Sequence, residues 1–380
     1  MQDMSTKREV WIDWLRVIAC FMVMVVHSTE PFYLGGEGTL VKSASDAFWA
    51  SFMDSLVRAC VPIFVVASSY LQFPMHYSSG EFLRRRAVRI LIPLAVWSVV
   101  YALIWGKPAE NFVNLLQNFN YAAGHLWFVY MLVGLYLIIP MLSPWAEKVT
   151  KTELQVYIGI WLFTTLIPFI RIWLGGEPPV IYGPSGIPNP ARYPLWGECS
   201  WNTSGTFYYL SGMIGYLLIG LYFRRFVGEL SWSKTLRAGL PCLIVGFAIC
   251  FGVFYTSVCR TTGGVYPFEG PVGIAAIWET PWMFDSTGVA LMTIGTIFLM
   301  RKITSCGSFY SRIVLPVSKA SYGMYLLHMI ILSQFAALYG RTLSCTPLII
   351  ILTAVSSYVC VAITAIVLQR IPKVGKYIIG

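Results

Sequence analysis

The most restrictive feature of this 380-residue chain is a series of long apolar segments that recurs along its whole length. The segments 90–105 and 348–368 are almost continuously apolar and do not alternate with polar positions. About 20 such residues in a helix cross the hydrocarbon core of a bilayer. Only 12% of the residues are charged, against about 25% in soluble domains. This pattern excludes a soluble enzyme and a disordered or fibrous chain.

The apolar segments predict an all-α polytopic membrane protein in which one transmembrane domain covers residues 1–380. We expect about ten transmembrane helices, at residues 9–28, 46–72, 87–106, 126–144, 154–174, 204–223, 238–258, 276–300, 313–336 and 346–369. The connection at about 175–203 is long and rich in Gly and Pro. A loop of this length favours a lid or wall over a site on the outer side.

Basic residues predict the orientation of these helices. When the ten spans alternate in direction, most of the 27 Lys and Arg residues fall in connections on one side. The positive-inside rule assigns that side to the cytoplasm, together with both chain termini. This placement explains the net charge of +10 without a nucleic-acid partner. The chain contains no Cys and His cluster with metal-binding spacing, so we expect no metal.

Three of the four histidines fall in the outer half of the membrane under this topology: His27, His125 and His328. A single histidine in an apolar helix is usually a packing residue. Three at similar depth favour a shared site, and histidine is the usual general acid or base near neutral pH. In the second span, Asp54 and Arg58 are spaced i,i+4 on one helical face. An ion pair within the helix explains Asp54, whereas Arg58 keeps donors for an anion or an oxyanion.

Further cations lie near the cytoplasmic ends of the first and third spans. Arg86 and Arg89 share a helical face and could bind one phosphate, or they could serve only as a positive-inside anchor. Arg16 precedes His27 by eleven residues, roughly 16 Å and close to three helical turns, so both lie on about the same face. A long donor entering from the cytoplasm could bind the cations and reach the histidine. We therefore expect a passage from the arginine doublet to His27.

Several short motifs together resemble the acyltransferase-3 family of integral membrane acyltransferases. In chain order they are Trp11-Ile12-Asp13-Trp14-Leu15-Arg16 followed by His27, Arg58 with Val61-Pro62-Ile63-Phe64, Arg86-Ala87-Val88-Arg89, His125-Leu126-Trp127-Phe128, Thr206-Phe207-Tyr208-Tyr209, and Ser321-Tyr322-Gly323-Met324-Tyr325-Leu326-Leu327-His328. Within that family the chain most resembles the stand-alone O-acetyltransferases of surface glycans, such as the enterobacterial common antigen type. It departs at Ser68-Ser69-Tyr70, where the family usually has Ser-Gly-Tyr or Ser-Gly-Phe.

The resemblance implies transfer of an acyl group, by default acetyl, from cytoplasmic acyl-CoA to a hydroxyl of a cell-surface glycan or lipid-linked glycan. It also implies a location in the cytoplasmic (inner) membrane of a bacterium. His27 would be the catalytic histidine, as a general base or as a covalent acyl-histidine. Arg58 or Tyr325 could hold the oxyanion, and His328 would line the outer site beside them.

The resemblance assigns donor binding to three cations and acceptor binding to the outer side. Arg86 and Arg89 would contact the phosphates of acetyl-CoA, and Arg16 would help to seat it. The substrate-binding side would include His125, Trp127 and Tyr325. No metal is required by this chemistry.

A second class of function is a secondary transporter or flippase for a polar or anionic substrate. Ten spans with buried charges would also suit that role, although transporters often show two related halves and none is visible here. A third reading is an inactive relative that acts as a sensor or scaffold. Consumption of acetyl-CoA with release of free thiol would separate the enzyme from both.

Overall fold

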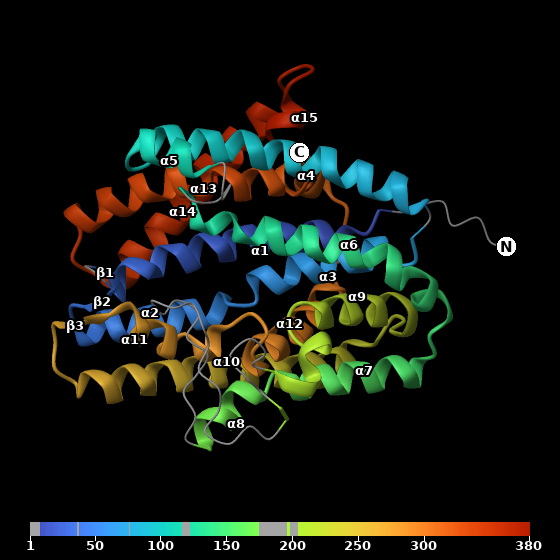
Figure 1. Ribbon diagram of the computed structural model, residues 1–380, viewed down its shortest axis with the longest axis horizontal. Coiled ribbons are helices and arrows are strands. Elements are labelled where there is room, and N and C mark those ends of the chain that lie inside the picture. Colours follow the sequence, from blue (N-terminus) through green and yellow to red (C-terminus); the bar gives the residue numbers. More distant parts are fainter. Residues whose placement is uncertain (1–7, 36–37, 76, 116–121, 175–195, 198–203) are drawn as a thin grey trace.

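The computed structural model describes residues 8–35, 38–75, 77–115, 122–174, 196–197 and 204–380. In it the long helices run side by side along the longest axis of the molecule (Figure 1). The elements are α1 (Val10–Thr29), η1 (Glu30–Phe32), β1 (Leu34–Gly35), β2 (Gly38–Val41), α2 (Ala44–Val57), α3 (Cys60–Gln72), α4 (Ser79–Ile104), α5 (Pro108–Asn114), η2 (Gly124–Leu126), α6 (Trp127–Lys148), α7 (Lys151–Thr164), α8 (Ile167–Trp173), η3 (Gly205–Leu210), α9 (Ile214–Phe226), α10 (Trp232–Thr262), β3 (Phe268–Pro271), α11 (Val272–Trp278), η4 (Thr280–Trp282), α12 (Thr287–Met300), η5 (Tyr310–Val314), α13 (Leu315–Thr342), α14 (Thr346–Gln369) and α15 (Gly375–Ile378). The predicted outer loop at 175–203 lies outside the described residues, apart from residues 196–197.

Nine helical segments in the described part of the chain are long and apolar enough to cross a membrane. The expected all-α polytopic membrane fold is therefore confirmed, with α14 at the residues predicted for the last span. The expected span at 204–223 differs, because it is divided into η3 and α9. Gly212, between them, has a φ of 73°, which interrupts a right-handed helix. The 13 residues of α9 reach only about 20 Å, less than the roughly 30 Å hydrocarbon core.

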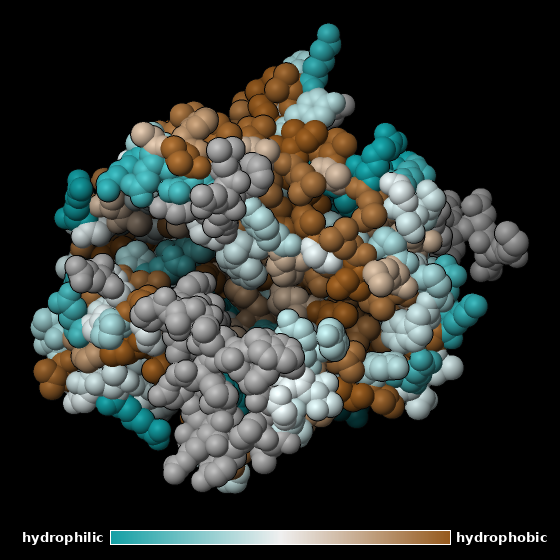
Figure 2. Space-filling view, in the orientation of Figure 1, coloured by the Kyte–Doolittle hydropathy of each residue, from teal (hydrophilic) through white to brown (hydrophobic). Residues whose placement is uncertain are grey.

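The distribution of side chains is the one expected for a protein in lipid. Apolar residues occupy much of the middle of the face in Figure 2, and hydrophilic ones gather toward its rim and ends. Large apolar side chains such as Met141 and Ile363 are exposed, whereas the ionisable Asp54 and His328 are completely buried. Charged groups inside a membrane are usually directed toward the protein interior and mark functional sites.

The helices α10 and α12 pack against each other through two pairs of glycines. A Cβ added to Gly246 would lie 2.5 Å from the carbonyl oxygen of Gly288. One added to Gly295 would lie 2.6 Å from the carbonyl oxygen of Gly239. Small residues allow this close backbone approach, which is a common way to pack helices in membranes. Helix α10 also packs against α2 and buries Phe254, whereas its opposite face carries exposed side chains such as Ile244.

A three-stranded antiparallel sheet, which the sequence analysis did not predict, lies at one end of the bundle (Figure 1). Strand β2 pairs with β1 on one side and with β3 on the other, with Thr39 opposite Gly270. The sheet joins the segment that follows α1 to the segment that precedes α11. We call this the sheet end of the bundle; the opposite end, which carries Arg84, Arg85, Arg86 and Arg89 on the first turns of α4, is called the basic end.

A candidate acyl-transfer site

The three histidines of the predicted spans meet in one cluster. His27 lies near the end of α1, His125 in η2 and His328 in the middle of α13. The ring centroids of His27 and His328 are 5.1 Å apart, and those of His125 and His328 are 5.0 Å apart. His328 is completely buried, whereas the side chain of His27 keeps 18% of its exposure. The structure therefore brings together the histidines that the sequence analysis grouped by depth.

Hydrogen bonds indicate which ring nitrogens are available for chemistry. The Nδ1 of His27 lies 2.8 Å from Oε1 of Glu30, three residues later in the chain. An ionised carboxylate can only accept, so this contact places the proton on Nδ1 and a lone pair on Nε2. The Nδ1 of His328 similarly lies 2.5 Å from the carbonyl oxygen of Tyr325. The Nε2 atoms of His125 and His328 are buried without a partner among the described residues. The cluster thus keeps hydrogen-bonding capacity for a bound group.

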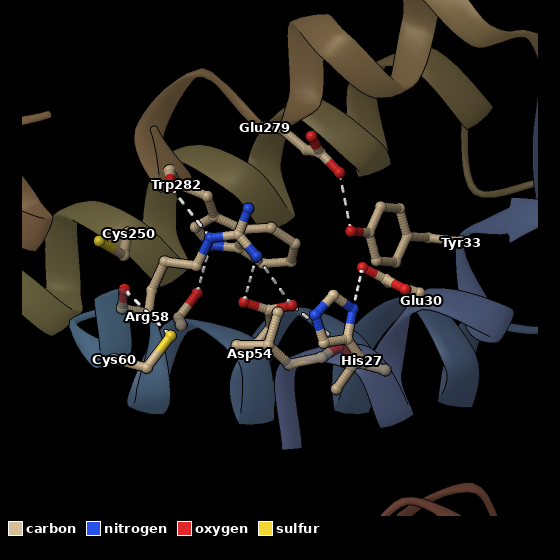
Figure 3. A network of polar contacts seen from close by, with 12 residues as sticks. His27, Glu30, Tyr33, Asp54, Arg58, Cys60, Cys250, Glu279 and Trp282 are labelled. Atoms are coloured by element: carbon tan, nitrogen blue, oxygen red, sulfur yellow. Dashed lines mark hydrogen bonds and ion pairs between the residues drawn. The ribbon is translucent and has the colours of Figure 1, made fainter. Parts of the chain in front are cut away.

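Arg58 forms a buried network next to His27 (Figure 3). Its Nη1 donates to Asp54 Oδ1 at 3.1 Å, so the i,i+4 ion pair expected from the sequence is present. The hydroxyl of Thr29 donates to the other Asp54 oxygen at 2.8 Å. Because Thr29 follows His27 by two residues, this bond connects the end of α1 to α2. Arg58 itself is fixed at the junction between α2 and α3 by a 2.9 Å bond from Nε to the carbonyl oxygen of Trp282.

Aromatic rings surround the Arg58 guanidinium. Its carbon lies 5.1 Å from the Trp282 ring centroid and 5.2 Å from that of Phe284. Trp127 stacks on Phe284 with centroids 5.5 Å apart, and 38% of its surface is exposed. Trp127 and Arg58 thus both contact the ring of Phe284. The predicted site residues near the sheet end therefore form two adjoining groups. One group surrounds the three histidines, and the other surrounds the Arg58 guanidinium.

A second buried carboxylate contact, between Tyr33 and Glu279, was not predicted from the sequence. The Tyr33 hydroxyl donates to Glu279 Oε1 at 2.7 Å (Figure 3). The three-stranded sheet brings these two residues together from distant parts of the chain. The vicinity of His27 is consequently rich in carboxylates, which are good partners for hydroxyl groups.

A basic cavity of about 590 Å³ opens from the other direction. Arg16, Arg86 and Arg89 all line it, as the sequence analysis proposed for a donor site. Two further cations, Arg8 and Lys319, complete its rim, and its lining contains no acidic side chain. The full lining is Arg8, Arg16, Phe64, Ser68, Leu71, Gln72, Arg86, Arg89, Ile90, Phe128, Leu132, Tyr136, Ser318, Lys319, Ser321, Tyr322, Tyr325, Gln369 and Gly380. The cavity therefore suits a polyanion with a less polar extension.

The lining of this cavity includes the aromatic rings of Phe128 and Tyr325, whose centroids are 5.1 Å apart. The Tyr325 hydroxyl donates to the carbonyl oxygen of His125, and its ring centroid lies 5.7 Å from that of His328. The cavity lining does not include His27. The passage expected from the sequence does not reach His27 within this cavity, and Tyr325 lies between the cavity and the histidines because it lines the one and contacts the rings of His125 and His328.

The uninterrupted helix α1 also settles how Arg16 and His27 are related. Both belong to Val10–Thr29, so their eleven-residue spacing places them on about the same helical face, as expected.

Arg8, just before this helix, is held by two 2.7 Å bonds to Asp13, which raise the pKa of its guanidinium. Tyr310 and Ser318 also donate to Asp13, each at 2.6 Å.

Sequence reasoning missed Glu30, although its i,i+3 spacing from His27 was a usable signal. It also missed the role of Arg8 and Lys319 at the cavity rim, because this depends on the way α1 and α13 pack. Among the described residues, no group of three His, Cys, Asp or Glu side chains could hold a metal ion.

Comparison with known proteins identifies the family. A sequence model of the family described as an acyltransferase domain matches residues 9–367. The comparisons with curated proteins and with solved structures gave no match. The matched range contains the basic cavity cations Arg16, Arg86 and Arg89 and all three histidines of the cluster. The chain belongs to the acyltransferase-3 family, a family of membrane acyltransferases.

Proposed function

We propose that this protein transfers an acyl group, by default acetyl, from acyl-CoA on the cytoplasmic side to a hydroxyl of a cell-surface glycan or lipid-linked glycan. One observation carries the proposal: the basic cavity ends one aromatic side chain away from the histidine cluster. A donor bound through its phosphates at the basic end would extend its thioester toward Tyr325. The protein would act in the cytoplasmic membrane of a bacterium, with its basic end and both termini inside.

The chemistry of the cavity supports donor binding there. Coenzyme A carries a diphosphate and a further phosphate, and guanidinium groups bind phosphate through paired hydrogen bonds. Arg86 is partly buried with its Nε unpartnered among the described residues, and its guanidinium lies 5.3 Å from the Phe82 ring and 5.4 Å from the Tyr136 ring. Burying a cation without a carboxylate is costly, which favours an anionic ligand at this position.

The hydrogen bond between His27 and Glu30 supports a general-base reaction. The Nε2 of His27 would take the proton of the acceptor hydroxyl, and the alkoxide would attack the thioester carbonyl carbon. The tetrahedral oxyanion would then collapse, breaking the carbon–sulfur bond. The leaving thiolate would take the proton from the imidazolium, so that the products are an ester and free coenzyme A. Glu30 would hold the imidazole in the productive tautomer and stabilise its charged form.

Oxyanion stabilisation is assigned to Arg58 rather than to Tyr325. Arg58 uses Nε and Nη1 for Trp282 and Asp54, which leaves Nη2 without a hydrogen bond among the described residues. The hydroxyl proton of Tyr325 is already engaged by the His125 carbonyl. His328 Nε2, buried and unpartnered, would position the acceptor hydroxyl or the thioester. His125 and Trp127 would line the acceptor side.

The direct test is to purify the protein in nanodiscs and follow thiol release from acetyl-CoA in the presence of surface glycan. Wild-type protein should release thiol and form an acyl ester that mass spectrometry detects on the glycan. His27→Ala should lose transfer by about 10²–10⁴-fold while inserting normally. Arg237→Gln, an exposed cation that lines neither the basic cavity nor the histidine cluster, is the matched control for surface charge.

Three results would contradict the proposal or refine it. Full activity of His27→Ala would remove this residue from the mechanism. Movement of a substrate across the vesicle membrane, without any release of thiol from acetyl-CoA, would favour a transporter instead. An acetylated peptide containing His27, trapped by rapid quenching, would replace the general-base step with a covalent acyl-histidine.

A further inference from the structure

A second, smaller cavity adjoins the basic cavity at the surface of the basic end. It measures about 430 Å³ and is lined by Tyr77, Phe82, Arg84, Arg85, Arg86, Val88 and Arg89. We call it the outer basin, a name that refers to its place at the surface of the basic end and not to the outer side of the membrane. Arg86 and Arg89 line both cavities, so the arginine doublet stands at the boundary between them. The doublet therefore separates the outer basin from the basic cavity.

The outer basin combines guanidinium groups with aromatic rings. Arg85 lies over the Tyr77 ring at 4.4 Å and is paired with Glu81 at 2.6 Å. Arg84 is exposed and has no hydrogen bond or ion pair to any described residue. Tyr77 is 47% exposed, so its ring is accessible. No acidic side chain belongs to the lining.

We propose that the outer basin is a nucleotide subsite that takes the 3′-phosphoadenosine half of the donor. This inference rests on the proposed function, and it adds residues that the donor-site motif does not include. The diphosphate would lie at Arg86 and Arg89, between the two cavities. The pantetheine arm would enter the larger cavity, and the adenine ring and the 3′-phosphate would contact Tyr77 and Arg84.

The chemistry of the basin favours a phosphorylated nucleotide. Guanidinium groups bind phosphate, and both guanidinium planes and tyrosine rings stack on a purine. A lipid headgroup phosphate would satisfy the cations equally well but offers no planar ring for Tyr77. The volume lies within the range of small-molecule sites, roughly 300–1,000 Å³. These two sources of phosphate make different predictions.

Two donors separate the subsite from the rest of the donor site. Acetyl-CoA contains the nucleotide, whereas S-acetyl-4′-phosphopantetheine ends at the phosphate expected to contact the arginine doublet. Arg84→Gln should raise KM about tenfold for acetyl-CoA and leave KM for the shorter donor within about twofold. Tyr77→Ala should show the same selectivity. Arg86→Gln should raise KM for both donors, and Arg237→Gln for neither.

A binding measurement distinguishes the nucleotide from a lipid. Adenosine 3′,5′-bisphosphate should compete with acetyl-CoA for wild-type protein in phosphatidylcholine nanodiscs, and about tenfold less well for Arg84→Gln. Equal effects of Arg84→Gln on both donors would overturn the subsite. Competition that phosphatidylglycerol abolishes would assign the basin to lipid phosphate and also overturn it.

Failure of the subsite and failure of the proposed function give different results. Wild-type protein that consumes neither donor but binds the bisphosphate through Arg84 would retain the subsite and contradict the reaction. Wild-type protein that consumes both donors with equal KM would retain the reaction and contradict the subsite. Protein that neither consumes a donor nor binds the bisphosphate would overturn both.

Discussion

The contact between His27 and Glu30 gives the sharpest test of the proposed chemistry, through the variant Glu30→Gln. A carboxylate 2.8 Å from Nδ1 accepts a charge-assisted hydrogen bond. Bonds of this kind contribute about 1.5–3 kcal/mol. The bond strengthens as the imidazole becomes charged, so its loss should raise the barrier of the chemical step by this amount. We therefore expect kcat to fall about 10- to 150-fold.

A glutamine at this position can also donate its amide hydrogens to Nδ1, and this would move the ring proton to Nε2, where it blocks the base. Glu30→Gln should accordingly be at least as damaging as Glu30→Ala. Neither variant should change KM for acetyl-CoA by more than about twofold, because Glu30 does not line the basic cavity. The effect should thus appear in kcat alone.

The assay is the initial rate of thiol release by purified variants in nanodiscs with saturating glycan, with acetyl-CoA varied to separate kcat from KM. Thermal unfolding of each variant controls for misfolding. Retention of more than half of the wild-type kcat would refute the role of Glu30. A change in KM for acetyl-CoA with an unaltered kcat would show that the site has been assigned to the wrong substrate.

Three further predictions concern packing and the separation of the two cavities. Asp54→Ala leaves the buried Arg58 without its carboxylate, so the unfolding free energy in detergent should fall by about 3–5 kcal/mol; an unchanged value would mean that the pair adds nothing. Gly246→Val drives a Cβ to 2.5 Å from a carbonyl oxygen of α12 and should lower Tm, whereas Gly252→Val, with nothing within 4 Å, should not. Phe128→Ala should increase acetyl-CoA hydrolysis measured without acceptor, because water would reach the thioester; an unaltered background rate would contradict a sealing role.

The membrane helices could be predicted from the sequence because their signal is local. Continuous apolar segments define a span regardless of its neighbours, and α14 matches its predicted bounds. The strands could not be predicted, since β2 pairs with β3 more than 220 residues away and neither has a distinct pattern. The division of the predicted sixth span was also missed, because a single positive φ at Gly212 carries no hydropathy signal.

The candidate site was predictable where depth alone brings residues together. Equal depth correctly grouped His27 with His125 and His328. Residues that depend on helix packing were not found, and Lys319 is an example, since only the rotation of α13 brings it to the rim of the basic cavity. Glu30 was missed for a different reason, because a carboxylate at the end of a span resembles any solvated residue.

The two rings of Phe128 and Tyr325 have a consequence for the cell that is separate from acylation. The proposed location, the cytoplasmic membrane of a bacterium, stores energy as a proton gradient, and any water-filled pore through it would conduct ions down that gradient. The proposed reaction requires a donor from one compartment and an acceptor from the other, but it does not require an open pore between them. An aromatic barrier at this depth would allow an acyl group to be transferred across the membrane without opening a pore that conducts ions.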